Sequence, residues 1–212
     1  VEDIELVREA EPGRELQLTL DRRLQYLAYR ELVATISEHQ ARSGSVVVLD
    51  VRTGAILAMA NYPSFNPNAR ERDSTEGVRN RALTDVLEPG SVVKPFVVAA
   101  AMEAGLARPD MLIDTAPGYM TVSGHTIEDF RNYGELTVTG VLTKSSNVGV
   151  VQLAMAMDAQ HMWSMYSRLG FGRVTGSGFP GESAGVLRDY QRWRKLEQAT
   201  LAYGYGLSVT PL

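Results

Sequence analysis

The sequence predicts an α/β fold in which an antiparallel sheet is flanked by helices. Three observations support it. The apolar runs Ser45–Val51 and Ala55–Ala60 flank a turn at Arg52-Thr53-Gly54, as in a β-hairpin. Apolar residues recur at helical spacing from Leu24 to Ile36. The segment Asn147–Ala159 is strongly apolar, which is typical of a buried helix.

The N-terminal part contains a strand pattern followed by a helix pattern. Leu16–Leu20 alternates apolar and polar residues, which predicts a short strand. Asp21 is a favoured N-cap, and helical spacing continues to about His39. The hairpin over residues 45–60 is apolar on both faces, which predicts a central position in a sheet. Because two strands rarely form a stable sheet, further strands are expected to complete it.

Loops and helices alternate after the hairpin. The segment Asn61–Gly90 is rich in Pro, Asn, Arg and Asp, which predicts a long loop of the kind that is usually functional or mobile. We expect mixed loop and short strand at Arg108–Thr139 and a glycine-rich loop at Gly170–Gly185. Helices are predicted at Ser91–Glu103, Asn147–Ala159, His161–Leu169 and Trp193–Tyr203.

Composition excludes several functional classes. The 212 residues are 44% apolar and 22% charged, which is typical of a globular chain rather than a disordered one. A net charge of −4 disfavours a nucleic-acid partner, because such binding depends on clustered positive charge. No cysteine is present, which excludes disulfides and thiolate chemistry. His39, His125 and His161 are too far apart to form a metal-binding pair, and we expect no metal or cofactor.

Neither a membrane span nor a signal peptide is visible in the sequence. The longest weakly polar run, Val148–Met157, is far shorter than the roughly 20 apolar residues of a spanning helix. The first residues, Val1–Glu5, are acidic. The chain begins without Met and has no closing signal at Thr210–Leu212. We therefore expect it to be part of a longer protein.

The sharpest local motif is Ser91-Val92-Val93-Lys94, at the start of a predicted helix. Residues three apart share a helix face, so the two polar side chains would lie together. Serine needs a base to become a good nucleophile, and lysine can serve if burial lowers its pKa. Helix N-terminal N–H groups could stabilise an oxyanion. The alternative is an N-cap serine beside a solvent-exposed lysine, because the pattern is common by chance.

A second motif is Lys144-Ser145-Ser146-Asn147, directly before the apolar helix. Ser145 could relay a proton between Lys94 and a leaving group. Asn147 could bind a substrate amide and orient Lys94. Helix capping is the alternative role of such residues. Three acids, Asp114, Glu128 and Asp129, could also pair, but their context favours a solvated loop.

Together the two motifs resemble a known family. Ser-x-x-Lys and Ser-x-Asn are two of the three motifs of penicillin-binding proteins and class A β-lactamases. From about residue 11 to residue 212, the sequence resembles the transpeptidase domain of class B penicillin-binding proteins, most closely the division-specific members. Further matching stretches lie at Gly54–Asn61, Phe65–Asn68, Arg79–Ala82, Gly178–Glu182 and Ala202–Pro211.

The resemblance implies a fold and a set of roles. The fold is that of the penicillin-recognising serine enzymes, with the site between an antiparallel sheet and an all-helical lobe. Ser91 is the implied acylated nucleophile, with its backbone N–H as one oxyanion donor. Lys94 is the implied general base, and Ser145 takes part in proton transfer. Asn147 binds the substrate backbone.

One departure from the family concerns its third motif. No Lys-Thr-Gly or Lys-Ser-Gly occurs in the sequence. In the family this motif lies on a strand beyond the Tyr-Gly-Tyr-Gly segment at residues 203–206. Residues 1–212 therefore resemble an incomplete transpeptidase domain that lacks its closing strands. We expect this part alone to be poorly folded and inactive, with an open sheet edge.

The implied activity is that of a septal peptidoglycan D,D-transpeptidase. It would cross-link stem peptides ending in D-Ala-D-Ala, be acylated by β-lactams and bind divisome proteins through the parent chain. The expected location is the periplasmic face of the bacterial inner membrane, with an N-terminal anchor outside this chain. The alternatives are a β-lactamase or D,D-carboxypeptidase using the same site, and a non-catalytic divisome binding module. Penicillin labelling and turnover of the label separate the three.

Overall fold

The computed structural model describes residues 13–68 and 75–212. The chain divides into two compact units, Val1–Tyr62 and Pro63–Leu212. The acidic N-terminal residues and part of the predicted Asn61–Gly90 loop lie outside the described residues.

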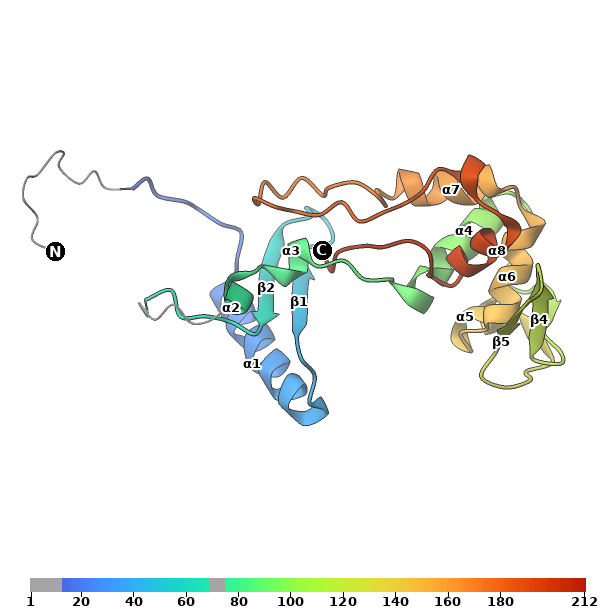
Figure 1. Cartoon of the computed structure of the whole chain (residues 1–212), viewed down its shortest axis with the longest axis horizontal. Coiled ribbons are helices and arrows are strands. Elements are labelled where there is room, and N and C mark those ends of the chain that lie inside the picture. The colour runs from blue at the N-terminus through green and yellow to red at the C-terminus, as the bar shows by residue number, and fades with distance from the viewer. Residues whose placement is uncertain (1–12, 69–74) are drawn as a thin grey trace, which may run out of the picture. The chain divides into compact units, whose positions relative to one another are not determined.

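The first unit is built from one helix and one hairpin (Figure 1). Helix α1 (Arg22–His39) begins as predicted, because the Asp21 carboxylate accepts the backbone N–H groups of Arg23 and Leu24. Its buried face packs against the hairpin strands β1 (Gly44–Leu49) and β2 (Ile56–Tyr62). The core of this unit consists of Ala28, Leu32, Ile36, Ala58 and Ala60.

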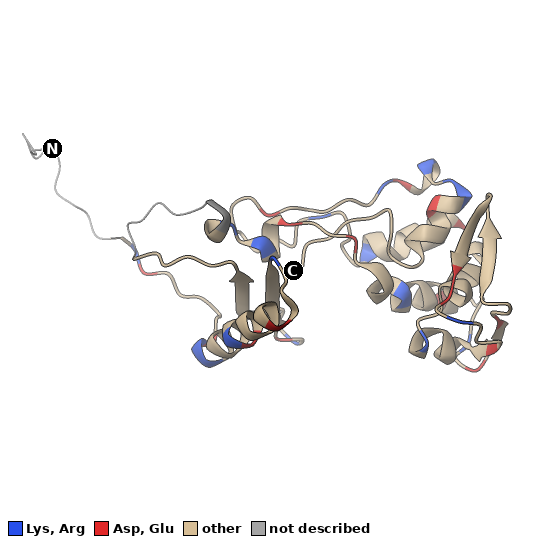
Figure 2. Ribbon diagram, turned by 60° about the horizontal axis from the view of Figure 1, so that its bottom comes forward, with Lys and Arg blue, Asp and Glu red and all other residues tan. Residues whose placement is uncertain are grey.

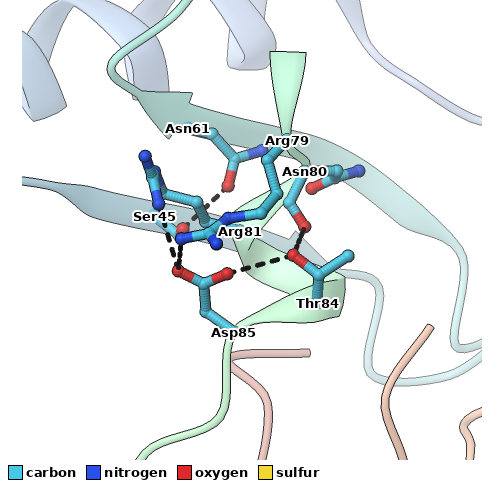
Figure 3. A network of polar contacts seen from close by, with 7 residues as sticks. All are labelled: Ser45, Asn61, Arg79, Asn80, Arg81, Thr84 and Asp85. Atoms are coloured by element: carbon cyan, nitrogen blue, oxygen red, sulfur yellow. Dashed lines mark hydrogen bonds and ion pairs between the residues drawn. The ribbon is translucent and has the colours of Figure 1, made fainter. Parts of the chain in front are cut away.

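The β1–β2 pair confirms the hairpin predicted for residues 45–60, but not its central position, because no third strand among the described residues pairs with it. The strands are antiparallel, with Val47 opposite Met59, and the register shifts between Val48 and Leu49. At the end of the hairpin opposite the turn, the Ser45 hydroxyl on β1 donates to the Asn61 Oδ1 on β2 at 2.7 Å (Figure 3).

The predicted strand at Leu16–Leu20 is wrong. The segment has no assigned strand, and Leu16 and Leu18 are 80% and 60% exposed. It is attached to β2 by the Thr19 hydroxyl, which donates to the Ile56 carbonyl, and by the Asp21 N–H, which donates to the Leu57 carbonyl. The alternating leucines find no apolar surface to cover them, so their pattern produces no half-buried strand.

The second unit is mainly helical. The 3₁₀ turn η1 (Gly90–Val93) leads directly into α4 (Lys94–Glu103), close to the predicted Ser91–Glu103 helix. Helix α6 (Asn147–Ala156) is buried almost throughout, also as predicted. Around these lie α5 (Val138–Thr143), which the sequence did not indicate, together with α7 (Ala159–Arg168), η2 (Tyr190–Arg192) and α8 (Lys195–Leu201). The helices α4, α6, α7 and α8 enclose one hydrophobic core.

Two small antiparallel strand pairs complete the second unit. Strand β3 (Leu112–Asp114) pairs with β6 (Glu135–Thr137), and β4 (Tyr119–Val122) pairs with β5 (His125–Glu128). Figure 1 shows β4 and β5 beside α5 and α6. Contacts between β5 and α6 bring the end of this hairpin to the start of the buried helix.

The predicted loop at Asn61–Gly90 contains two short helices, α2 (Thr75–Val78) and α3 (Arg81–Thr84). A polar network holds α3 (Figure 3). The buried Arg81 and the exposed Arg79 both pair with Asp85, at 3.2 and 2.9 Å. The Thr84 hydroxyl donates to the Asn80 carbonyl. Each of these helices is only four residues long, too short for apolar periodicity to indicate it, and α3 is supported by the burial of Ala82 and Leu83 and by the ion pairs with Asp85.

Charged residues of both signs are interspersed in each unit (Figure 2). No helix within residues 13–68 and 75–212 combines the length and apolar character that crossing a bilayer requires.

Candidate active site

The Lys94 amine is the centre of the candidate site. Although it is a lysine in the first turn of α4, its exposed fraction is 1%. Nζ donates to the Ser145 carbonyl at 2.5 Å, to the Ser145 hydroxyl at 3.0 Å and to the Asn147 Oδ1 at 2.8 Å. An ammonium has three N–H donors and no acceptor, so these contacts satisfy it completely. The alternative of a solvent-exposed Lys94 is therefore wrong.

Burial changes the acidity of this lysine. Removal from water lowers the Lys94 pKa from 10.5 to about 8, while the negative charge of Asp129 acts in the opposite direction. A displacement of that size corresponds to about 3 kcal/mol against the ammonium form. A lysine of this kind holds a useful fraction of free amine near neutral pH, as a general base requires.

Ser91 lies on the 3₁₀ turn that precedes α4, and its side chain is exposed. Among the described residues, no hydrogen bond joins its hydroxyl to the Lys94 amine, although the spacing led us to expect one. The ammonium donates its three N–H groups to Ser145 and Asn147 and has no lone pair with which to accept a proton from Ser91. Loss of one proton from Lys94 would supply that lone pair.

The second motif reaches Lys94 through an unusual backbone conformation. Ser145, between α5 and α6, has φ 55°. A left-handed conformation costs a non-glycine residue about 1–2 kcal/mol. Here it places both the carbonyl and the hydroxyl oxygen of Ser145 on the Lys94 amine. Ser145 and Asn147 thus lie together at Lys94, and the catalytic roles of all four motif residues stay predictions.

Asp129, at the end of β5, is a residue that the sequence analysis placed in a solvated loop. That interpretation is wrong. Its carboxylate accepts the Ser146 hydroxyl at 2.6 Å and the backbone N–H groups of Asn147 and Val148 at 2.5 and 3.0 Å. Beside it, the Asn147 side-chain amide donates to the Glu128 carbonyl at 2.8 Å. No local pattern indicates this role, because the contacts span 17 to 19 residues.

The loop that carries Ser91 is held by the segment around residues 204–209. The Gly90 N–H donates to the Gly204 carbonyl at 3.1 Å, and the Gly206 N–H donates to the Glu88 carboxylate at 2.8 Å. A Cβ on Gly204 would lie 2.0 Å from the Gly90 carbonyl oxygen. Only glycine fits this approach at position 204, while Gly206 has a left-handed φ of +92°.

A hollow of about 250 Å³ lies on another side of the same loop. Its lining includes Pro89, Val92, Phe96, Phe171 and Thr210. Lys94, Ser145 and Asn147 do not line it, so it is separate from the point where the motif side chains meet.

The side chain of His161 is engaged on the side of α4 that carries Ala100 and Glu103. The His161 ring contacts the Ala100 carbonyl at 3.1 Å and lies 4.0 Å from the Glu103 carboxylate. In the part of the chain that the structure describes, no three His, Cys, Asp or Glu side chains are grouped to hold a metal ion.

Comparisons with known proteins identify the family to which the chain belongs. Residues 44–212 match the family described as the penicillin binding protein transpeptidase domain. The peptidoglycan D,D-transpeptidase FtsI of Escherichia coli K12 is 48% identical over 212 residues, which is 100% of this chain and 36% of that protein. The probable peptidoglycan D,D-transpeptidase PenA of Neisseria gonorrhoeae is 46% identical over 200 residues, 94% of this chain and 34% of the relative.

A solved structure extends the comparison to the fold. The apo structure of the transpeptidase (TP) domain of penicillin-binding protein 3 from Burkholderia pseudomallei is 42% identical, with a TM-score of 0.83. The match covers 94% of this chain and 56% of that one. The α/β fold expected from the resemblance is confirmed. The chain spans about a third of the length of the curated relatives named above. By sequence and by structure, the chain belongs to the family of penicillin binding protein transpeptidase domains.

Proposed function

We propose that the protein is a serine-type peptidoglycan D,D-transpeptidase. The observation that carries this proposal is the buried Lys94, which follows the exposed Ser91 by three residues. The Lys94 amine is hydrogen-bonded to Ser145 and Asn147. Burying a lysine without an ion-pair partner is costly, and its lowered pKa is what a general base needs. The similarity to curated D,D-transpeptidases supports the same activity.

The proposed first half-reaction is acylation of Ser91. The Ser91 oxygen attacks the carbonyl carbon of the penultimate D-Ala, and its proton passes to the free amine of Lys94. The backbone N–H of Ser91 donates to the oxyanion of the tetrahedral intermediate. As the C–N bond breaks, the terminal D-Ala amine takes a proton from Lys94 through the Ser145 hydroxyl, which lies 3.0 Å from Nζ. An ester on Ser91 and free D-Ala result.

The second half-reaction transfers the acyl group to an amine. The amine of a neighbouring stem peptide attacks the Ser91 ester and loses a proton to Lys94. The new amide bond is the cross-link, and Ser91 regains its hydrogen. A β-lactam would acylate Ser91 in the same way through opening of its ring. Asn147 would hold the substrate backbone, with its side-chain amide shared between Lys94 and the β5 strand end.

The wider cellular role is part of the proposal. Similarity to FtsI and to a penicillin-binding protein 3 domain supports a role in septal cell-wall synthesis with divisome proteins as partners. It also supports a location at the periplasmic face of the inner membrane, with an anchor outside residues 1–212. Within this scheme, residues 1–212 are one part of the transpeptidase domain, and a Lys-Thr/Ser-Gly motif elsewhere in the protein would bind the substrate carboxylate.

The test is covalent labelling of the full-length protein by penicillin. We expect stoichiometric acylation in intact mass spectra and its loss in Ser91→Ala, because no other residue forms the ester. Ser43→Ala, which changes an exposed serine ahead of β1, is the matched control and should label normally.

Product analysis then separates the alternatives. With a stem pentapeptide as donor and an amine acceptor, a transpeptidase gives the cross-linked amide. A carboxypeptidase gives only the tetrapeptide acid, and a β-lactamase releases hydrolysed penicillin rapidly. A wild-type protein that is never acylated would support the non-catalytic binding module instead, and would remove Ser91 from its role.

A further inference from the structure

Asp129 connects the end of β5 to the second motif at the start of α6. It directly follows β5, which ends at Glu128, and its two carboxylate oxygens hold the start of α6. One oxygen accepts the Ser146 hydroxyl, and the other accepts the N–H groups of Asn147 and Val148. Since these N–H groups have no partner within the helix, the carboxylate satisfies donors that would otherwise be lost to the interior.

The Ser146 hydroxyl connects this carboxylate to the body of α6. Ser146 is fully buried, donates to Asp129 and accepts the Gly149 N–H at 2.9 Å. At Gly149 the helix lies against α5 so closely that an added Cβ would stand 2.5 Å from Val141. The start of α6 is therefore fixed on one side by packing and on the other by Asp129.

The charge of Asp129 also acts on the base. Its negative charge favours the ammonium form of Lys94 and so opposes the effect of burial on the Lys94 pKa. The other charged groups on elements packed against α4 are engaged elsewhere or exposed. Glu103 pairs with Arg168 and lies near His161, and Lys144 is exposed.

We propose that Asp129 is a positioning residue for acylation, because its carboxylate holds the start of α6 and thereby fixes Asn147 against Lys94. Because it concerns the same site, this role rests on the proposed function. Asp129 itself touches no reacting atom in this scheme. It acts by positioning the second motif and by the electrostatic effect of its negative charge on the Lys94 amine.

Two substitutions separate geometry from charge. In Asp129→Asn, the amide oxygen still accepts the Asn147 and Val148 N–H groups, and the side-chain NH₂ can donate to the Ser146 oxygen. The shape is kept and the charge is removed. In Asp129→Ala, both are lost. Asp110→Asn, which removes an 82% exposed carboxylate in the same unit, is the matched control.

The experiment measures the second-order rate of acylation by a chromogenic β-lactam, from pH 6 to pH 10, in the full-length protein. For Asp129→Asn we expect the rising limb of the profile to move to lower pH, with the plateau kept within about tenfold, because loss of the negative charge disfavours the ammonium. For Asp129→Ala we expect the plateau to fall about 10²-fold, the effect of a displaced catalytic group. Asp110→Asn should give the wild-type profile.

Two results would overturn the proposal while leaving the proposed function intact. One is an Asp129→Asn profile that superimposes on that of the wild type, which would leave the residue a helix cap without influence on the base. The other is a folded Asp129→Ala protein that acylates at the wild-type plateau rate. If Asp129→Ala does not fold, the pH of the rising limb in the Asp129→Asn profile decides whether the proposal holds. Failure of the wild type to acylate would instead refute the proposed function.

Discussion

At the scale of single residues, the site depends on one lysine that is held between opposing influences. Burial removes water from the Lys94 amine and lowers its pKa, while Asp129 favours the charged form. Oxygen atoms of Ser145 and Asn147 accept hydrogen bonds from all three N–H groups of the Lys94 ammonium. The resulting pKa of about 8 leaves the ammonium dominant at neutral pH but makes the free amine accessible.

The first prediction concerns the pH dependence of acylation in the wild type. A base acts in its deprotonated form, so the second-order rate should rise about tenfold per pH unit below pH 8 and level off above it. Stopped-flow measurements with a chromogenic β-lactam would test this.

Lys94→Arg provides the control for that profile. Arginine keeps the positive charge but does not lose its proton in this pH range, so we expect a loss of at least about 10²-fold and no limb near pH 8. A flat wild-type profile, or a limb that persists in the arginine variant, would show that another group is the base.

At the scale of elements, the position of the proposed nucleophile Ser91 depends on two chain segments that approach closely at Gly90 and Gly204. The first residue of η1 is bonded to the segment that follows α8, through the Gly90 N–H and the Gly204 carbonyl. The Glu88 carboxylate adds a bond to the Gly206 N–H, and Leu87 pairs with Val209. The orientation of Ser91 is therefore determined by residues more than a hundred positions away.

Gly204→Ala tests this connection. Gly204 has φ +89°, and an added Cβ would lie 2.0 Å from the Gly90 carbonyl, so the loop must move. We expect a loss of stability and a fall of acylation by about 10²-fold, as for a misplaced catalytic group. Thermal melts and penicillin labelling measure the two effects.

Gly105→Ala is the matched control. Gly105 also has a positive φ, +72°, but an added Cβ would meet no atom within 4 Å. It should cost about 1–2 kcal/mol of stability and leave acylation near the wild-type rate. Equal effects of the two alanines would mean that the close approach at Gly204 does not position Ser91.

At the scale of the whole molecule, each unit has a hydrophobic core of its own. In Val1–Tyr62, the core is a small cluster between α1 and the hairpin. In Pro63–Leu212, it is the larger cluster enclosed by α4, α6, α7 and α8. The four motif residues of the candidate site, Ser91, Lys94, Ser145 and Asn147, all lie in the second unit.

The small core should be sensitive to a single truncation. Ile36 is 8% exposed on the inner face of α1, next to the position where β1 begins at Gly44. Ile36→Ala should destabilise this unit by about 2–5 kcal/mol, the usual cost of truncating a buried aliphatic side chain. Amide hydrogen exchange over α1, β1 and β2 would show faster opening. Glu38→Ala, on the exposed face of α1, should leave the exchange rates unchanged, and a matching effect of both variants would contradict the assignment of this core.

Local sequence determined the elements whose own residues supply their signals. The Asp21 cap and apolar spacing predicted α1, and the apolar runs on either side of Arg52-Thr53-Gly54 predicted the hairpin. The apolar character of residues 147–156 predicted a buried helix. The resemblance carried by Ser91, Lys94, Ser145 and Asn147 identified the family before any geometry was known. Each of these depends on residue types and short spacings, which a sequence displays directly.

Tertiary structure decided what depends on contacts between distant segments. The alternating leucines of residues 16–20 form no strand because nothing covers them. Helix α3 is held by distant segments, since Ala82 and Leu83 are buried and their carbonyls accept the N–H groups of Leu212 and Ser183. The sequence places Asp129 in a solvated loop, but in the structure β5 positions it at the start of α6, against residues 17 to 19 positions further along the chain. Even the burial of Lys94 is a tertiary fact: a lysine beside a serine is ordinarily solvated, and only the Ser145–Asn147 segment folding over its amine makes it a candidate base.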